Sequence, residues 1–357
     1  PSAVVCGACH DNVDFATGEG HAGGAQQDDD VCGICHAPGS GQVFDRSIRG
    51  AHKPLYKSPQ FPGLLVEIID VTDTNPGDKP TVTFSLGSKN GKLNPAGLNR
   101  LRFTITGPNE DFSFYVQETV GSSAVKAGDY WAYTFDTPLP EDAEGSFSVS
   151  FEGRNEVTID LGDEESVERD QAQNTMFAFA VTDEVAVPRR MVVDDAKCES
   201  CHANLSLHGG NRHNPQYCNT CHRPDLVDIA DIAENVSFKW MIHKIHRGEE
   251  LENGYVVVRS RGTFDFGHIE FPGDLRNCEK CHVNDSYMLP LPDGLLPATT
   301  PNQWWDPIEP MAAACLSCHD GDDANAHAFT NTTYFGESCA TCHGEGKEFA
   351  VEKVHAR

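Results

Sequence analysis

Every cysteine of this chain belongs to the same short motif. The 14 cysteines form seven C-x-x-C pairs, and a histidine directly follows each pair. The pairs are Cys6 with Cys9, Cys32 with Cys35, Cys198 with Cys201, Cys218 with Cys221, Cys278 with Cys281, Cys315 with Cys318, and Cys339 with Cys342. The histidines after them are His10, His36, His202, His222, His282, His319 and His343. Because every cysteine lies in the motif, none remains for a disulfide.

C-x-x-C-H is the attachment signature of c-type haem. Two thiols three residues apart can each form a thioether to one haem vinyl group, and the next histidine can reach the iron as proximal ligand. Zinc sites, disulfides and thioredoxin-like redox pairs are the alternatives. A zinc site needs two C-x-x-C units at a regular separation, and the separations here vary widely. The repeated motif therefore predicts seven covalent haems c, with the 14 cysteines as thioethers.

The motifs are unevenly distributed. Two lie within residues 6–36 and five within 198–343, while the 161 residues between His36 and Cys198 contain none. That gap has segments in which apolar and polar residues alternate, separated by turn-forming clusters such as NPGDKP and LPEDAEG. The alternating segments are 64–71, 81–86, 100–107, 130–135, 147–153 and 176–182. Short alternating segments at this spacing predict an antiparallel β-sandwich or split barrel of roughly seven strands.

We therefore expect three parts. These are a two-haem N-terminal module at 1–58, the β-domain at 59–190 and a five-haem domain at 191–357. The haem segments have little periodicity and many Gly, Asn, Asp and Pro residues, as expected for a multihaem cytochrome c fold in which short helices and loops wrap the haems. Residues 226–248 and 164–175 are the better helix candidates.

Nine histidines lie outside the motifs and are candidates for the second axial position of the irons. They are His21, His52, His208, His213, His243, His246, His268, His327 and His355. They avoid the β-domain and gather in the haem segments. Methionine, the other common ligand at the second axial position of the iron, occurs only five times. We therefore expect uniform bis-histidine ligation and low-spin irons, which suit electron relay better than bond-making chemistry.

The stretch FKWMIHKIHRGEE places two of these histidines on one face of a predicted helix, since residues three apart share a face. Each haem has one vacant axial position, so we expect His243 and His246 to bind two different irons. The haems at Cys218/Cys221, Cys278/Cys281 and Cys198/Cys201 are the candidates.

Charge and hydropathy exclude some classes of function. The formal net charge of -27 argues against nucleic acid as a partner, because binding to it needs cationic contacts with phosphate. No apolar run is long enough to span a membrane. The start PSAVVCGACH lacks the features of a signal peptide, so we expect a mature, processed or fragment N-terminus. DGDD at 320–323 is a candidate calcium contact, with a solvated acidic loop as the alternative.

Several segments resemble the outer-membrane multihaem cytochromes of the MtrC/OmcA type. The resemblance rests on CGACHDNVDFATGEGH, VCGICH, CHANLSLHGGNRHNPQYCNTCHRP, WMIHKIHRGEE, IEFPGDLRNCEKCH, CLSCHD and SCATCHGEGKEFAVEKVH. It implies distal ligand roles for His21, His52, His208, His243, His246, His327 and His355, and leaves His213 and His268 without one. The family members also carry a further β-domain and three more haems, and some carry a cysteine pair in the β-domain. From the sequence given, we therefore expect a shortened, seven-haem form.

The function we expect is extracytoplasmic electron transfer, at the cell surface or beyond it, with the periplasm as the alternative. The resemblance implies metal oxides, flavins and other cytochromes as acceptors, and an outer-membrane electron conduit as partner. We expect an electron carrier rather than an enzyme with a dedicated substrate site. One alternative is a polymerising cytochrome that associates head to tail in a filament. The other is a multihaem reductase with one open haem.

Overall fold

The computed structural model describes residues 1–355, except residues 11, 43–44, 54–58, 161–164 and 203–204. Its contacts divide the chain into two compact units. One comprises Pro1–Gly63 and Asn155–Gln171, and the other comprises Leu64–Arg154 and Ala172–Arg357. Each unit is described by itself. The three-part division at 58/59 and 190/191 stays a prediction.

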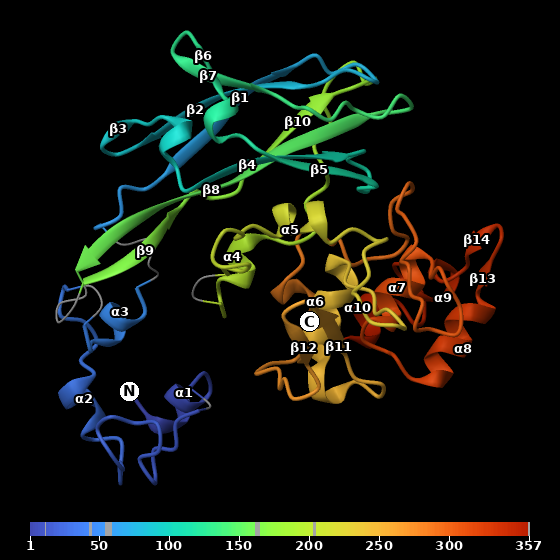
Figure 1. Cartoon of the computed structure of the whole chain (residues 1–357). Helices are drawn as coiled ribbons and strands as arrows, with labels where there is room; N and C mark the ends of the chain where they lie inside the picture. The colour runs from blue at the N-terminus through green and yellow to red at the C-terminus, as the bar shows by residue number, and fades with distance from the viewer. Residues whose placement is uncertain (11, 43–44, 54–58, 161–164, 203–204, 356–357) are drawn as a thin grey trace. The chain divides into compact units, whose positions relative to one another are not determined.

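The larger unit contains most of a β-sandwich (Figure 1). Its strands form two five-stranded antiparallel sheets, with the orders β1-β2-β7-β6 and β10-β8-β4-β5; β3 pairs with β2 and β9 with β8. The strands are β1 (Leu65–Thr72), β2 (Thr81–Ser88), β3 (Gly91–Lys92), β4 (Arg100–Gly107), β5 (Phe114–Thr119), β6 (Val125–Ala127), β7 (Tyr130–Thr134), β8 (Ser146–Asp160), β9 (Glu165–Gln171) and β10 (Met176–Ala180). Two 3-10 turns, η2 (Pro95–Gly97) and η3 (Gly121–Ser123), lie in the connections.

The core of the sandwich consists of aromatic and branched side chains from both sheets. In β2, every second residue is buried, so one face of the strand supplies Val82, Phe84 and Leu86 to the core. Phe84 meets Phe103 of β4 with ring centroids 4.8 Å apart in an edge-to-face arrangement. This contact joins the two sheets through the middle of the domain.

The fold-class prediction is confirmed, since each of the six alternating segments lies on a strand. The predicted number of roughly seven strands is too low, because β3, β5, β6 and β9 lie outside the six alternating segments. The helix expected at 164–175 is wrong: the described part of that segment contains the strand β9. Its exposure alternates, and it pairs with the long strand β8, so tertiary pairing overrides the local propensity of this charged segment.

The C-terminal part of the larger unit consists of short helices, two small hairpins and long connections (Figure 1). Its elements are α4 (Asp195–Cys198), α5 (Pro215–Cys221), α6 (Phe238–Arg247), η4 (Gly248–Glu250), β11 (Val256–Arg259), β12 (Gly262–Asp265), η5 (Cys278–Lys280), α7 (Pro310–Leu316), α8 (Asp322–Thr330), β13 (Thr332–Thr333), β14 (Gly336–Glu337), α9 (Ala340–His343) and α10 (Val351–Val354). A second, smaller core surrounds Trp240 and Tyr255.

The helix predicted at 226–248 is shorter than expected, because only Phe238–Arg247 is helical. The carboxylate of Asp228 accepts hydrogen bonds from the backbone N–H groups of Ala230 and Glu234. Such side-chain to backbone bonds offer the chain an alternative to a helix. The helix α6 therefore begins only after this loop.

The smaller unit contains α1 (Ala3–Gly7), α2 (Cys32–Cys35) and α3 (Ile48–Ala51), with the hairpin residues 155–171. Ser2 caps α1 and Ser47 caps α3, because each hydroxyl accepts a hydrogen bond from a backbone N–H of the first turn. None of the helices in the described ranges is long and apolar enough to cross a membrane.

Candidate haem sites

All seven motifs fold into the same local structure. In each, the backbone N–H of the histidine donates to the carbonyl of the first cysteine, and the N···O distance is 2.9 Å every time. This is the hydrogen bond of one helical turn, between residues four apart. The turn gives both cysteines and the following histidine the same arrangement in every copy. Each copy therefore has the local geometry that two thioethers to one porphyrin require.

In most motifs the two cysteines differ in exposure. In five motifs the first cysteine is half-buried and the second is exposed; the exposed second cysteines are Cys9, Cys35, Cys201, Cys281 and Cys342. In the motif at Cys315/Cys318 the first cysteine is the exposed one, and Cys218 and Cys221 are both half-buried.

An exposed second cysteine is compatible with the predicted thioether role, because a thioether sulfur must point out of the polypeptide toward the edge of the porphyrin. The thioether role of all 14 cysteines stays a prediction.

Each motif histidine faces a second histidine. The centroids of the two rings lie 6.0–6.2 Å apart in all seven cases. The pairs are His10–His52, His36–His21, His202–His246, His222–His208, His282–His243, His319–His355 and His343–His327. The first two pairs lie in the smaller unit and the other five in the larger unit. The second members are the seven histidines for which the family resemblance implied a distal role.

The spacing within each pair fits one iron. Metal–nitrogen bonds to imidazole are about 2 Å long. The centre of a five-membered ring lies roughly 1 Å from its nitrogen atom. Two metal–nitrogen bonds and two of these distances therefore add up to the observed separation of the ring centroids. A direct hydrogen bond between two imidazoles would also bring the rings together. Such a bond, however, gives no reason why the same pairing occurs at all seven C-x-x-C-H motifs. The residues present therefore fit a haem held between each pair.

Hydrogen bonds orient many of these rings. An Nδ1 atom that donates a hydrogen bond leaves Nε2 unprotonated and free to bind a metal. In His222, Nδ1 lies 2.6 Å from the carbonyl oxygen of Val236, and in His282 it lies 3.0 Å from the hydroxyl of Ser286. The other rings with an Nδ1 contact of this kind are those of His21, His36, His52, His243, His246, His343 and His355.

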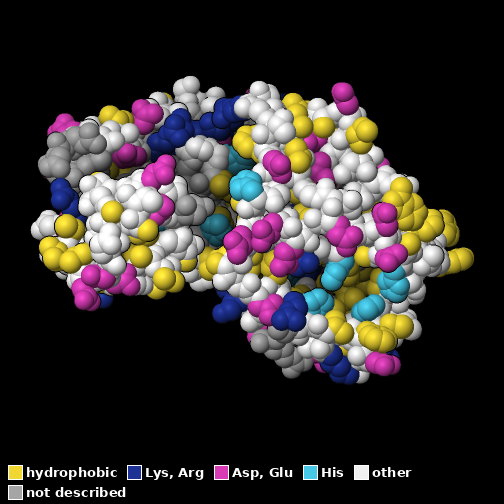
Figure 2. Space-filling view, turned by 90° about the horizontal axis from the view of Figure 1, so that it is seen from below, with side chains coloured by type: hydrophobic (Ala, Val, Ile, Leu, Met, Phe, Trp, Pro, Cys, Tyr) yellow, Lys and Arg dark blue, Asp and Glu magenta, His cyan; other side chains and the backbone are white. Residues whose placement is uncertain are grey.

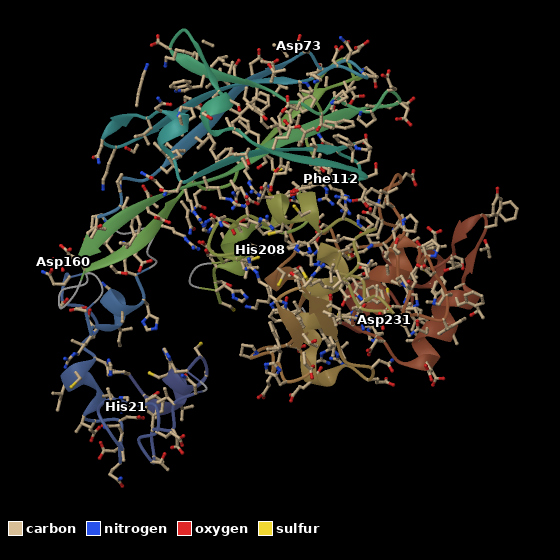
Figure 3. The ribbon with its side chains drawn as sticks, in the orientation of Figure 1. His21, Asp73, Phe112, Asp160, His208 and Asp231 are labelled. Atoms are coloured by element: carbon tan, nitrogen blue, oxygen red, sulfur yellow. The ribbon has the colours of Figure 1, made fainter. Side chains whose placement is uncertain are left out.

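Helix α6 contributes to two different pairs. His243 faces His282, whereas His246, less than one turn further on, faces His202. Of the three candidate haems for this helix, the structure thus brings together those at Cys198/Cys201 and Cys278/Cys281. The third motif, at Cys218/Cys221, faces His208 instead, on the segment between α4 and α5 (Figure 3).

Two features hold α6 in place. Trp240 and Lys244 are almost fully buried on the helix. At its C-terminal end, Gly248 adopts a φ of +41°, and a Cβ atom there would lie 2.1 Å from the carbonyl oxygen of Ile269. The packing of the helix and its glycine cap together fix the direction of both histidines.

Burial keeps several of these imidazoles neutral. Burial lowers the pKa of His243 to about 3, with a further contribution from the neighbouring His282. Burial likewise lowers the pKa of His222 and that of His282 to about 4. A neutral ring is the form that binds a metal. Figure 2 shows histidine side chains gathered with hydrophobic side chains in hollows of one face.

The two histidines without a predicted ligand role lie elsewhere. His213 is 3% exposed, and its backbone N–H donates to the side chain of Asn174, which also bonds the carbonyl of Phe151 in β8. This histidine therefore belongs to the contact with the β-sandwich. His268 is exposed. Since each motif histidine already faces another histidine, neither is needed as an axial partner.

The calcium contact considered at 320–323 gains no support. Asp320 pairs with the buried Lys244 at 3.4 Å and accepts hydrogen bonds from the backbone N–H groups of Glu252 and Asn253. Across the described ranges, no group of three or more His, Cys, Asp or Glu side chains is arranged to hold a metal ion. Asp320 therefore has a structural role.

The chain is similar to several known proteins. Residues 190–356 match the family described as outer membrane cytochrome MtrC/MtrF-like, domains II/IV. The multiheme cytochrome MtrC of Shewanella baltica strain OS185 is 25% identical over 289 residues, which is 74% of this chain and 38% of that protein. The chain thus spans less than half the length of this relative.

Two crystal structures are similar to the chain. That of MtrC from Shewanella baltica OS185 has a TM-score of 0.56 and 18% identity, over 96% of this chain and 60% of that one. That of the outer membrane decaheme cytochrome OmcA has a TM-score of 0.49 and 19% identity, over 80% of this chain and 46% of that one. The seven C-x-x-C-H motifs, the family match over residues 190–356 and the MtrC relative together support an MtrC/OmcA-family multihaem c-type cytochrome.

Proposed function

We propose that the chain is an extracytoplasmic electron relay that carries seven haems c, each bound axially by two histidines. The observation that carries the proposal is the repeated pairing of a motif histidine with a second histidine at 6.0–6.2 Å. We also propose a two-haem module at 1–58, a β-domain at 59–190 and a five-haem domain at 191–357, with two of the pairs in the first part and five in the last.

The protein's own residues hold each relay site in one geometry. A haem c supplies a one-electron Fe(III)/Fe(II) couple. The two cysteines of each motif would fix the position of the porphyrin, and the two imidazoles would bind its iron. Burial or hydrogen bonds at Nδ1 hold many of the rings, so the same ligands can serve both oxidation states. An electron can then enter and leave with little rearrangement.

The paired histidines favour a relay over a reductase. A reductase that binds its substrate at iron needs one axial position open, and each of the seven motif histidines here has a partner. We propose other cytochromes as electron donors, and metal oxides, flavins or further cytochromes as acceptors. The net charge of -27 favours acceptors with cationic or metal-oxide surfaces. Attachment of c-type haem outside the cytoplasm is the basis of the proposed location.

Anaerobic stopped-flow absorbance spectroscopy tests the relay. The holoprotein is reduced with dithionite, freed of excess reductant, and mixed with a soluble ferric chelate, ferric oxide particles or oxidised flavin mononucleotide. We expect all haems to be reoxidised by at least one acceptor and carbon monoxide to leave the reduced spectrum unchanged. A fraction of haems that stays reduced with every acceptor, or that binds carbon monoxide at once, would overturn the proposal.

A further inference from the structure

A buried carboxylate in the β-sandwich lies among three arginines. Glu152 of β8 has a fully buried side chain. It forms ion pairs with Arg100 of β4 and, at 3.0 Å, with Nε of Arg212, while Nη1 of Arg102 lies 4.0 Å away. The arginine side chains are 19–38% exposed. Three guanidinium groups around one carboxylate leave an excess of positive charge at this place, in a chain whose net charge is -27.

Arg212 connects this cluster to one haem site. It follows His208 in a tight loop, where Leu207 and Arg212 form a β-bridge and the side chain of Asn211 donates to the carbonyl of His208 at 2.9 Å. His208 faces His222, the histidine of the motif at Cys218/Cys221. The arginine that neutralises Glu152 is therefore held four residues from an axial ligand.

The motif of the same site is docked on the same sheet. Tyr217 precedes Cys218 in α5, and its hydroxyl lies 3.2 Å from Oγ1 of Thr104 in β4 and 3.1 Å from Nε2 of Gln117 in β5. Both sides of the site are thus fixed against the sheet that contains Glu152.

We propose that Arg212 and Glu152 set, in opposite directions, the reduction potential of the haem held between His208 and His222. The inference rests on the proposed function. Reduction adds one electron to Fe(III), breaks no bond and moves no proton, so the site loses one positive charge. A fixed positive charge nearby stabilises the reduced form, and a fixed negative charge stabilises the oxidised form. The β-sandwich thereby changes the reduction potential of a haem that it does not bind covalently.

Charge-changing variants of the holoprotein test this, with an optically monitored redox titration as the assay. Arg212→Gln removes the positive charge, Glu152→Gln removes the negative charge, and Arg212→Lys keeps the charge in a different shape. A unit charge about 12 Å away, at an effective dielectric constant of about 20, changes an equilibrium about tenfold. For one electron that corresponds to about 59 mV. Lys92→Gln, which breaks an exposed pair with Asp129 on the β-sandwich, is the control.

We expect one haem to shift about tenfold toward the oxidised form in Arg212→Gln and about tenfold toward the reduced form in Glu152→Gln. Arg212→Lys and Lys92→Gln should leave the titration within about twofold of wild type. Unchanged titrations in both glutamine variants, shifts of the same sign, or an equal shift in Lys92→Gln would overturn the inference. If Glu152→Gln does not fold, the contrast between Arg212→Gln and Arg212→Lys decides.

The same samples separate the two proposals. A high-spin ferric signal in the wild-type protein would count against bis-histidine ligation and hence against the proposed function. Low-spin haems whose reduction potentials do not change when Arg212 is replaced would count only against the electrostatic role of the cluster.

Discussion

Replacing His246 with alanine removes the ring that faces His202 at 6.1 Å and leaves the ring of His243 in place. The His243 ring faces His282 at 6.0 Å and contacts the hydroxyl of Ser317 through Nδ1 at 2.9 Å. We therefore expect His246→Ala to open the axial position of the haem at Cys198/Cys201, and His243→Ala to open that of the haem at Cys278/Cys281.

The size of the effect follows from the number of pairs. With seven motifs, each single variant should convert one seventh of the ferric iron from low spin to high spin. The double variant should convert two sevenths, because the two rings belong to separate pairs. Low-temperature electron paramagnetic resonance of the oxidised holoprotein, quantified against total haem, measures these fractions. His268→Ala removes an exposed histidine from the same domain and is the matched control.

Two results would refute this reasoning. One is a double variant that converts only one seventh of the iron, because both rings would then serve a single haem. The other is a His268→Ala spectrum with as much high-spin iron as either single variant, because the partner of a motif histidine would then have been misassigned.

Three further predictions concern the protein scaffold. Asp320→Ala should cost about 3 kcal/mol in urea unfolding because it leaves the buried Lys244 without its partner, whereas the double variant Asp320→Asn, Lys244→Met removes both charges and should cost about 1 kcal/mol or less; equal costs would contradict the role of the pair. Tyr217→Phe should cost about 1–2 kcal/mol without changing the haem spectrum, and an unchanged melting temperature would argue against its two hydrogen bonds. Burial raises the pKa of Glu118, but hydrogen bonds from two backbone N–H groups and a tyrosine hydroxyl outweigh it and hold the pKa below its usual value. Glu118→Gln should therefore be less stable than wild type above pH of about 4.3, and the difference should shrink as the pH falls; a difference independent of pH would refute this linkage.

Much of the fold and the attachment motifs could be predicted from local sequence. C-x-x-C-H is a local arrangement, and strands such as β2 show their buried face as simple alternation. The exposure of individual thiols such as Cys9 could not be predicted, because it depends on which segments pack beside the motif. β5 (Phe114–Thr119) escaped prediction because nearly all of its residues are partly buried and its alternation is weak. β9 (Glu165–Gln171) is rich in charge and is a strand because β8 extends beside it.

The histidine pairing could be predicted only in part. The excess of histidines in the haem segments indicated which residues are candidates for the second position. The partner of each ring, however, depends on tertiary structure. His202 and His246 are 44 residues apart, and His319 meets His355 only because α10 returns the chain to it. No local pattern contains that information.

The measurement that tests the central proposal most directly is electron paramagnetic resonance of the fully oxidised native holoprotein at low temperature, with the spins quantified against haem content. Seven bis-histidine sites predict seven ferric haems per chain, all low spin. A high-spin ferric signal equal to one or more haems in the native protein would contradict the axial pairing from which the relay is inferred.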